Sequence, residues 1–310
     1  MPIKLLEDFP AKKVIEAENI FAIDNQRAEQ QDIRPLKMLI LNLMPNKLDT
    51  EIQLLRLISQ SPLQIDVDFL KITSHNHKNT SIHHLAKFYL EFAEVKDLYY
   101  DGLIITGAPV EQLAFEEVDY WQELQAIMDW SQTNVYSTVH ICWGAQAALY
   151  HHYGVEKTAY SEKLFGVFPQ QKNSEDRLLR GFDDVFACPQ SRYTGLVMET
   201  VDLERLTVTA QAEIGATMLI SKDRHDIFLL GHWEYDTDSL KKEYFRDAEK
   251  GLATALPKNY FVNDDPEGKI INNWRAHANL FYHNWLNDVY QGTPFELTEI
   301  LAINQSRLKK

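Results

Sequence analysis

The sequence predicts an α/β fold in which helices cover both faces of a doubly wound, mostly parallel sheet. Two observations predict it. Apolar runs alternate four times with segments whose apolar residues recur at helical spacing, and this alternation is typical of parallel βαβ units. The first run, residues 37–44, is almost continuous in apolar residues, which is the pattern of a strand buried on both faces.

Each element follows from its local pattern. Four apolar runs predict strands at residues 37–44, 64–72, 99–106 and 135–141. Four segments of helical periodicity after them predict helices at residues 50–58, 85–94, 115–130 and 145–150. After residue 150 the alternation ends. Two apolar runs joined by four polar residues predict a hairpin of residues 217–221 and 226–230, and two more helices are expected at residues 240–250 and 272–290.

The domain organisation is expected to be simple. Residues 1–34 are polar, mixed in charge and weakly periodic, so we expect an extension that packs on the domain or on a partner. Residues 35–310 contain no repeat and no linker rich in Gly, Pro or Ser, which favours a single α/β domain with C-terminal helices. We expect no signal peptide, because Pro10 interrupts the N-terminal segment early. No window approaches the ~20 apolar residues of a membrane span.

The composition excludes several classes of protein. The chain has 31 Lys and Arg against 45 Asp and Glu, a formal net charge of −14. This balance argues against nucleic acid and anionic membranes as partners, although local basic residues still allow an anionic coenzyme to bind. Two cysteines are too few for a disulfide scaffold or a Cys-rich zinc module, and we expect a protein of the reducing cytoplasm.

Cys142 is the strongest candidate for a catalytic residue. The predicted strand 135–141 runs directly into Cys142, Gly144 follows two residues later, and a helix begins at once. This is the layout of a nucleophile elbow, where a sharp turn lifts the nucleophile above the carboxyl edge of the sheet. The helix dipole favours the thiolate, and the backbone N–H of Trp143 is placed to stabilise an oxyanion. The alternative is a small cysteine packed at a strand end.

A base and an acid follow another apolar run. Gly231, His232, Trp233 and Glu234 come directly after residues 226–230. If the segment is extended, His232 and Glu234 point to the same side, near the carboxyl edge where open α/β sheets bind ligands. A thiol nucleophile needs a base, and the base needs an acid to orient it. The residues thus predict a Cys142–His232–Glu234 triad, with a chance surface pair as the alternative.

The remaining histidines predict no metal site. Four of them stand in a polar connection, expected to be a solvated loop, with no acidic or thiol residue among them: His75, His77, His83 and His84. His151 and His152 end a predicted helix, where imidazole suits the helix dipole. Cys188 has no base at a suggestive spacing and is expected to pack in the core.

Several ordered motifs give the chain a family resemblance. They are Asn42–Lys47, Thr106–Glu111, His140–Gln146, Lys163–Val167, Ser191–Tyr193, Gly231–Asp236, Tyr244–Asp247 and Trp274–His277. Over nearly its whole length the chain is similar to the homoserine O-acyltransferases of methionine biosynthesis, whose fold resembles that of class I glutamine amidotransferases. His140 stands where amidotransferases usually have glycine, two residues before the cysteine, and this favours the acyltransferase branch.

The resemblance implies a role for each matching residue. Cys142 would attack an acyl-CoA thioester and hold the acyl group. His232 would act as general base, first for Cys142 and then for the homoserine hydroxyl. Glu234 would orient His232. Arg246 would grip the homoserine α-carboxylate, a task suited to a guanidinium. Two further residues would line the substrate pocket: Lys163 and Ser191. Trp233 departs from the family pattern, which has Pro there; in an extended segment its side chain points away from the triad.

The resemblance also implies small-molecule partners. L-homoserine and an acyl-CoA would be the substrates, no cofactor or metal would be bound permanently, and the family favours a homodimer. Without the resemblance, the residues indicate cysteine-dependent acyl transfer on a flavodoxin-like sheet with the acceptor open. A hydrolase, a glutamine amidotransferase and a non-enzymatic binding module remain alternatives at that level.

Glu111 is the residue expected to decide which acyl donor is used. In this family the donor is either acetyl-CoA or succinyl-CoA. It follows the strand 99–106 at the edge from which Cys142 emerges. Two like charges ~4 Å apart at an effective dielectric of ~20 repel by about 4 kcal/mol, so a glutamate would disfavour the second carboxylate of a succinyl group. In the family, Glu here goes with acetyl transfer and Gly with succinyl transfer. Acetyl-CoA is therefore the expected donor; a glutamate that only caps the helix near Phe115 is the alternative.

Overall fold

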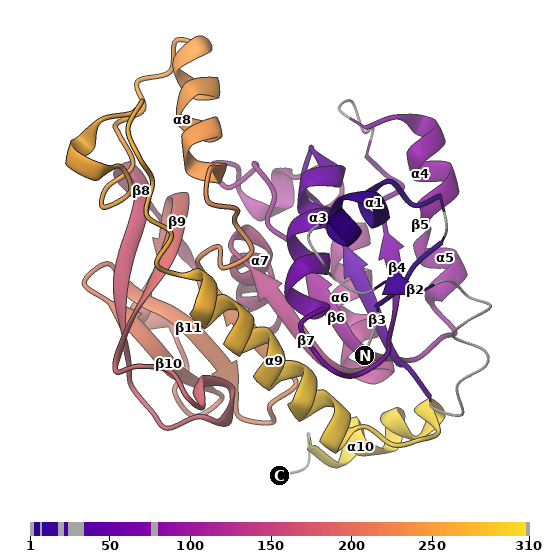
Figure 1. The fold of residues 1–310 in the computed structure, drawn as a ribbon. Coiled ribbons are helices and arrows are strands. Elements are labelled where there is room, and N and C mark those ends of the chain that lie inside the picture. Colours follow the sequence, from indigo (N-terminus) through magenta and orange to yellow (C-terminus); the bar gives the residue numbers. More distant parts are fainter. Residues whose placement is uncertain (1–2, 7, 18–21, 24–33, 76–79, 308–310) are drawn as a thin grey trace.

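The computed structural model describes residues 3–6, 8–17, 22–23, 34–75 and 80–307. A single sheet of twelve strands runs through them in the order β2-β1-β4-β3-β6-β7-β12-β11-β10-β8-β9, with β5 paired to β4 (Figure 1). The α/β class and the mostly parallel character of the first half are confirmed. In this described part no helix is long and apolar enough to cross a membrane.

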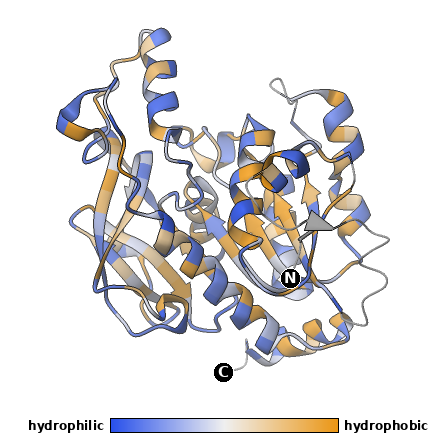
Figure 2. Ribbon diagram, viewed as in Figure 1, coloured by the Kyte–Doolittle hydropathy of each residue, from blue (hydrophilic) through white to orange (hydrophobic). Residues whose placement is uncertain are grey.

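The parallel half of the sheet matches the predicted alternation. Its central strands are β3 (Leu36–Leu41), β4 (Ile65–Leu70), β6 (Tyr100–Ile105) and β7 (Val135–Ile141). The helices that follow β3, β6 and β7 are α3 (Lys47–Ile58), α6 (Trp121–Asn134) and α7 (Trp143–Tyr153). Every residue of β6 and β7 is buried, and Figure 2 shows these strands as apolar. Leu103 and Ile105 face one core and Ile104 faces the other, which is why helices cover both faces.

Two predicted helices have different bounds in the structure. The segment 85–94 is divided into α4 (Ile82–Phe88), the short strand β5 (Tyr89–Leu90) and α5 (Phe92–Val95). Tyr89 pairs with Phe69 of β4, and its hydroxyl donates to Oε1 of Glu51 at 2.6 Å, so long-range pairing overrides helical periodicity. The segment 115–130 begins with a 3₁₀ turn at Phe115–Glu117, and α6 starts only at Trp121.

The other half of the sheet is antiparallel. It contains β8 (Lys157–Lys172), β9 (Val185–Leu196), β10 (Leu206–Ala212), β11 (Gly215–Ser221) and β12 (Asp226–Leu229). The predicted hairpin is confirmed as β11 and β12. The long β8–β9 hairpin was not predicted, because the burial of β8 follows no regular alternation. β12 is antiparallel to β11 and parallel to β7, so it joins the two halves.

The two predicted C-terminal helices are confirmed with small shifts, as α8 (Ser239–Glu249) and α9 (Arg275–Gly292). A third helix, α10 (Ile300–Arg307), was not predicted. Figure 1 shows α9 crossing in front of the sheet. Its Trp285 is fully buried and donates from the indole nitrogen to Oγ of Ser137 in β7 at 3.1 Å. These helices therefore complete the core of the first half.

The described residues before Pro35 lie at the far edge of the sheet. They form β1 (Ile3–Lys4), α1 (Pro10–Ala17) and β2 (Ala22–Ile23), and β1 pairs in parallel with β4. The rest of residues 1–34 lies outside the described residues, and the division into 1–34 and 35–310 stays a prediction.

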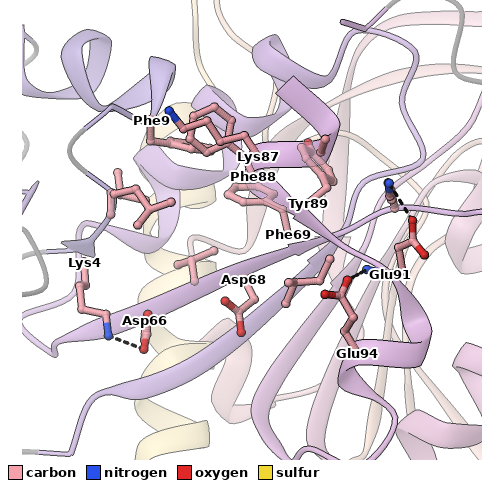
Figure 3. Close-up of a pocket in the computed structure, with 16 residues that line it drawn as sticks. Lys4, Phe9, Asp66, Asp68, Phe69, Lys87, Phe88, Tyr89, Glu91 and Glu94 are labelled. Atoms are coloured by element: carbon pink, nitrogen blue, oxygen red, sulfur yellow. Dashed lines mark hydrogen bonds and ion pairs between the residues drawn. The ribbon is translucent and has the colours of Figure 1, made fainter. Parts of the chain in front are cut away.

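A cavity of about 590 Å³ opens beside β1, β4 and α4, with Phe9, Phe69 and Lys87 among its lining (Figure 3).

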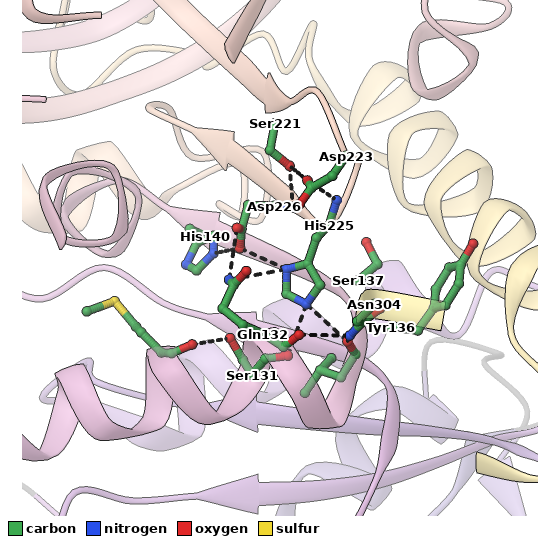
Figure 4. Close-up of polar contacts among 12 residues, drawn as sticks. Ser131, Gln132, Tyr136, Ser137, His140, Ser221, Asp223, His225, Asp226 and Asn304 are labelled. Atoms are coloured by element: carbon green, nitrogen blue, oxygen red, sulfur yellow. Dashed lines mark hydrogen bonds and ion pairs between the residues drawn. The ribbon is translucent and has the colours of Figure 1, made fainter. Parts of the chain in front are cut away.

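A buried polar network ties β7 to β12 (Figure 4). Asp226 is fully buried and lies 2.8 Å from Nε2 of His140 and 3.2 Å from Nδ1 of His225. Gln132 and Tyr153 donate to its other oxygen at 3.0 and 3.3 Å. Burial alone would raise the pKa of Asp226, but His225 and His140 hold this pKa well below its ordinary value. The carboxylate is therefore a charged link between the strands.

We predict that Asp226→Ala lowers the free energy of unfolding by about 3–5 kcal/mol, since it leaves two buried imidazoles without their counter-charge. Urea unfolding at pH 7 measures the loss, and Glu213→Ala, at an exposed turn, should change stability by less than ~0.5 kcal/mol. Because the folded-state pKa is depressed, this stability is present above ~pH 4 and fades as the pH falls further. A loss below about 1 kcal/mol would contradict a stabilising role.

Candidate active site

Cys142 occupies a sharp turn between β7 and α7. Its backbone has φ 51° and ψ −114°, an unusual conformation for a residue other than glycine, and its N–H donates to the carbonyl of Leu229 at 2.7 Å. Such strain costs of order 1–3 kcal/mol and clusters at functional sites. A Cβ on Gly144 would lie 2.6 Å from the carbonyl oxygen of Thr106, so glycine is needed for α7 to begin this close to β6. The geometry is that of the predicted elbow.

His232 and Glu234 lie together after β12, although their backbone is not extended. The segment forms a turn in which the N–H of Tyr235 donates to the carbonyl of His232 at 3.3 Å, so the extended geometry expected from the sequence is wrong. The turn still brings Oε1 of Glu234 to 2.6 Å from Nδ1 of His232. Trp233 points away and packs against the rings of Phe182 and Phe281.

The electrostatics couple His232 to Cys142. Burial by itself would lower the pKa of His232, but the charges of Cys142 and Glu234 and the hydrogen bonds to both side chains raise it well above its ordinary value. These contacts favour the protonated form of the ring beside the sulfur. Since Glu234 holds Nδ1, Nε2 remains for the thiol, and the three side chains form the predicted triad geometry.

Two backbone segments border the sulfur. Trp143 is the first residue of α7, where an N–H has no acceptor within the helix. Gly107 approaches from the loop after β6, and a Cβ built on it would lie 3.3 Å from Cβ of Cys142 and 3.8 Å from Cε1 of His232. Gly107 was not predicted from the sequence; the signal that could have identified it is a glycine near the end of the strand that neighbours β7.

Two acidic residues, Glu243 and Asp247, bring together Lys163, Ser191 and Arg246. Neither acid was predicted from the sequence as a site residue. Nζ of Lys163 lies 2.8 Å from Oε1 of Glu243 and 3.0 Å from Oδ2 of Asp247. Ser191 donates to the same Glu243 oxygen at 2.8 Å, and Arg246 donates to Asp247 at 2.8 Å. Both acids lie on α8. Burial would lower the pKa of Lys163, but Glu243 and Asp247 raise it, so this is a compact group of paired charges.

Tyr235 connects this group to the triad. Its ring stacks on the ring of His232, with centroids 4.2 Å apart and planes 14° apart. Burial, and then the nearby charges of Glu243, Glu234 and Cys142, raise the pKa of its phenol. Because the pKa of Tyr235 responds both to Glu243 on α8 and to the triad residues Glu234 and Cys142, the α8 acids and the thiol belong to one site.

Glu111 also faces this site. Burial raises the pKa of its carboxyl, while a hydrogen bond from the backbone N–H of Tyr193 and the positive charges of His232, Lys163 and Arg192 lower it. The capping alternative is not supported, because Glu117 is the residue whose carboxylate accepts from the N–H of Ala114 at the 3₁₀ turn.

Known proteins match the chain over almost all of its length. The sequence profile of the homoserine O-succinyltransferase family matches residues 2–295. A homoserine O-acetyltransferase of Acetivibrio thermocellus is 53% identical over 306 residues, which are 97% of this chain and 100% of that protein. One of Geobacillus kaustophilus is 53% identical over 96% of this chain and 99% of that protein. The chain belongs to the homoserine O-succinyltransferase family.

Solved structures agree with the fold predicted for this family member. A glutamine amidotransferase of Thermotoga maritima has a TM-score of 0.55 at 12% identity and covers 84% of this chain and 100% of its own. One of Methylobacillus flagellatus has a TM-score of 0.52 at 13% identity, covering 84% and 96%. At such low identity these matches establish the class I glutamine amidotransferase-like fold and nothing about activity.

The other histidines of this family member lie apart from the triad. Contrary to the expectation of a solvated loop, His83 and His84 lie on α4, and His84 bonds Glu51 at 2.8 Å; His77 lies outside the described residues. Asp129, His151 and His152 place ligand atoms within 4.8 Å of one another, but at the end of α7 opposite Cys142.

Burial and position exclude Cys188 and the 590 Å³ cavity from the triad site. Cys188 is buried, and burial raises the pKa of its thiol far above the ordinary value, which agrees with a packing role. The residues lining the 590 Å³ cavity include none of the triad. The chemistry of the side chains, not the size of a cavity, therefore locates the site of this family member.

We predict that iodoacetamide alkylates Cys142 and spares Cys188. His232→Gln should slow the alkylation of Cys142 at pH 7 by about tenfold or more, because it removes the imidazolium that stabilises the thiolate. The rate in this variant should then rise steeply toward pH 8–9, the range of an ordinary thiol. Peptide mass spectrometry follows each cysteine, and His151→Gln, at the far end of α7, is the matched control. Equal rates in both variants would contradict the coupling of His232 to Cys142.

Proposed function

We propose that the chain transfers an acetyl group from acetyl-CoA to the hydroxyl of L-homoserine through a thioester on Cys142. The products are O-acetyl-L-homoserine and CoA, in methionine biosynthesis. The observation that carries the proposal is the Cys142–His232–Glu234 geometry with the Glu111 carboxylate facing it. Relatives named homoserine O-acetyltransferase at 51–53% identity support the same assignment.

The first half-reaction forms the acyl-enzyme. The Cys142 thiolate attacks the thioester carbonyl, a C–S bond forms, and negative charge develops on the carbonyl oxygen. The N–H of Trp143 and the backbone of Gly107 border the position of this oxygen, where donors stabilise it most. When the intermediate collapses, the bond to the CoA sulfur breaks, and the departing thiolate takes the proton that His232 holds.

The second half-reaction returns the thiol. His232 is then neutral and accepts the proton of the homoserine hydroxyl as its oxygen attacks the acyl carbon. The C–S bond to Cys142 breaks, and the thiolate is restored beside the protonated ring. Glu234 keeps Nδ1 of His232 bonded at 2.6 Å throughout, so one nitrogen serves both proton transfers.

The charged group on β8, β9 and α8 suits the zwitterionic end of homoserine. Arg246 bonds Asp247 through one edge of its guanidinium and is about half exposed, so its remaining donors can reach a substrate carboxylate. Glu243 already gathers Lys163 and Ser191 and is of the right charge to meet the ammonium group. We assign Arg246 to the α-carboxylate and the other residues to the shape and charge of the pocket.

Glu111 is the reason for preferring the acetyl donor over the succinyl donor in the family's name. A second carboxylate on the acyl group would approach that of Glu111 in a partly desolvated site, where like charges ~4 Å apart repel by about 4 kcal/mol. An acetyl group ends in a methyl and meets no such penalty. Glu111 also fills volume that the longer acyl group requires.

The cellular setting follows from the chemistry. The nucleophile is a free cysteine, and a reducing compartment such as the cytoplasm keeps it active. We propose a cytoplasmic homodimer that binds acetyl-CoA and L-homoserine transiently and needs no permanently bound cofactor.

We predict one acetyl adduct on Cys142 when the protein meets acetyl-CoA without homoserine. Intact mass spectrometry should show it in the wild type and not in Cys142→Ala, while Cys188→Ala, which removes the buried cysteine, retains it. Addition of homoserine should discharge the adduct and make CoA release continuous. Acylation itself releases one equivalent of CoA, so release beyond one equivalent without homoserine would indicate a hydrolase, and an adduct that persists in Cys142→Ala would refute the nucleophile.

We predict that Glu111→Gly raises kcat/KM for succinyl-CoA relative to acetyl-CoA by about 10²–10³, the factor that ~4 kcal/mol of repulsion allows after some screening. Steady-state rates with both donors give the ratio. Glu117→Gly, in the same loop but bonded to the N–H of Ala114, is the control and should leave it unchanged. A wild-type preference for succinyl-CoA would overturn the acetyl assignment.

A further inference from the structure

Lys157, the first residue of β8, binds the loop that carries Glu111. Its Nζ donates to the carbonyl oxygens of Glu111 and Leu113 at 2.6 and 2.5 Å, and it lies 4.4 Å from the centroid of the Phe115 ring. An ammonium group has three donors, and two carbonyls and a ring face can engage all of them. The three partners fall within residues 111–115, so one cation holds a whole turn of the chain.

The ammonium group of Lys157 gives up part of its water to make these contacts. The residue is half-buried, and burial lowers the pKa of its amine although the charges of Glu111, Glu116 and Glu117 raise it. A cation that loses water needs hydrogen bonds in its place, and the two carbonyl oxygens supply them. The amine is therefore fixed at the turn and is not a freely solvated surface charge.

The turn that carries Glu111 is an exposed one. The N–H of Leu113 donates to the carbonyl of Val110 at 3.1 Å, so Glu111 stands inside the turn Val110–Leu113, in which Gln112 and Leu113 are exposed. Exposed turns belong to the least stable parts of a fold. A contact from another element, such as that of Lys157, therefore decides where Glu111 lies.

The β8–β9 hairpin holds Glu111 at a second point. The carboxylate of Glu111 accepts a hydrogen bond from the backbone N–H of Tyr193 on β9. β8 and β9 pair so that Lys157 lies opposite Leu196, close in sequence to Tyr193. The backbone of Glu111 is thus bonded to one strand of the hairpin and its side chain to the other.

The same hairpin is bonded to the helix that begins at the nucleophile. The hydroxyl of Thr194 on β9 donates to Oε1 of Gln146 at 2.9 Å, and its carbonyl accepts from Nε2 of Gln146 at 3.2 Å. Gln146 lies in the first turn of α7, where its N–H donates to the carbonyl of Cys142 at 3.1 Å. Since both sets of bonds end on one pair of strands, the hairpin sets the position of Glu111 relative to the thiol.

We propose that Lys157 is a positioning residue that fixes the turn of Glu111 at the acyl pocket, and thereby sets the preference for a short neutral acyl group over a longer anionic one. The inference rests on the proposed function, because it concerns the choice of donor for the same thioester chemistry. Without the ammonium group, two carbonyls lose their donor and the turn relaxes. The Glu111 carboxylate then leaves the position in which it repels the second carboxylate of a succinyl group.

The test compares kcat/KM for acetyl-CoA and succinyl-CoA in the wild type, Lys157→Met and Lys157→Arg. In Lys157→Met, which keeps an unbranched side chain but loses the charge, the acetyl-to-succinyl ratio should fall at least tenfold. Lys157→Arg, a longer donor that can still reach both carbonyls, should stay within threefold of the wild type. Lys258→Met is the matched control, because this exposed lysine pairs with Glu162 of β8 at 3.7 Å, and its ratio should not change.

A double variant shows whether Lys157 acts through Glu111. When Lys157→Met is added to Glu111→Gly, the donor ratio should stay within threefold of that of Glu111→Gly alone, because both changes remove the same interaction. A larger further change overturns the proposal, since Lys157 would then act on the donor by another route.

Two other kinetic outcomes overturn the proposal. If Lys157→Met raises KM for both donors and leaves their ratio unchanged, the ammonium group binds the CoA moiety that the donors share. If the variant uses succinyl-CoA less well relative to acetyl-CoA, the ammonium group attracts the second carboxylate directly. Failure of the proposed function is a different result, since the wild type would then show no homoserine-dependent acetyl transfer.

Hydrogen exchange tests the same contact without turnover. In Lys157→Met the amides of residues 107–114 should exchange at least threefold faster than in the wild type, whereas Lys258→Met should leave their rates unchanged. If Lys157→Met does not fold, Lys157→Gln, a shorter and uncharged donor, replaces it in both measurements with the same expected direction. Unchanged exchange and an unchanged donor ratio in the folded variant overturn the proposal.

Discussion

The parallel pairing of β7 with β12 is the contact on which the site depends. Ile141 lies opposite Leu229 in this register, and the N–H of Cys142 donates to the carbonyl of Leu229. Because both strands end at the same edge, the nucleophile and the base emerge side by side although they are far apart in sequence. The buried link between His140, two residues before Cys142, and Asp226, the first residue of β12, joins the same two strands, so the pairing that carries the site is secured by backbone and side-chain contacts.

Around this pairing, the molecule contains strained and buried polar groups that lower its stability and that an ordinary core lacks. Cys142 has a positive φ, the imidazole of His232 is buried with its pKa raised by its neighbours, and Arg192 keeps a buried nitrogen without a partner. Each feature would destabilise a fold by itself. Local features of this kind are expected where a structure serves function at the expense of stability.

The aromatic packing explains how so polar a site is held in shape. Trp233 stands between His232 and Glu234 in the chain, and its ring packs against Phe182, Phe186 and Phe281. The packing of this indole holds the turn in place. The side chains of His232 and Glu234, on either side of Trp233 in the chain, can then bond to each other. The indole of Trp233 is buried in this turn.

The sequence by itself determined the parts of the protein that follow from local patterns. Apolar runs and helical spacing predicted the four central strands, three of the four helices between them, the β11–β12 hairpin, α8 and α9. The strand–Cys–x–Gly–helix order predicted the elbow at Cys142. These features depend on neighbouring residues in the chain, through burial of one face and through the freedom of one glycine.

Only the tertiary structure decided the features that depend on distant partners. Tyr89 leaves its helical pattern because β4 offers a strand to pair with, and β8 and β9 form a long hairpin with no regular pattern in their sequence. The approach of Gly107 to Cys142 and the contacts of Lys163 with two acids of α8 are set by the packing of separate elements. Spacing along a chain does not encode these distances, because a charge or a backbone atom acts through space on whatever the fold brings beside it.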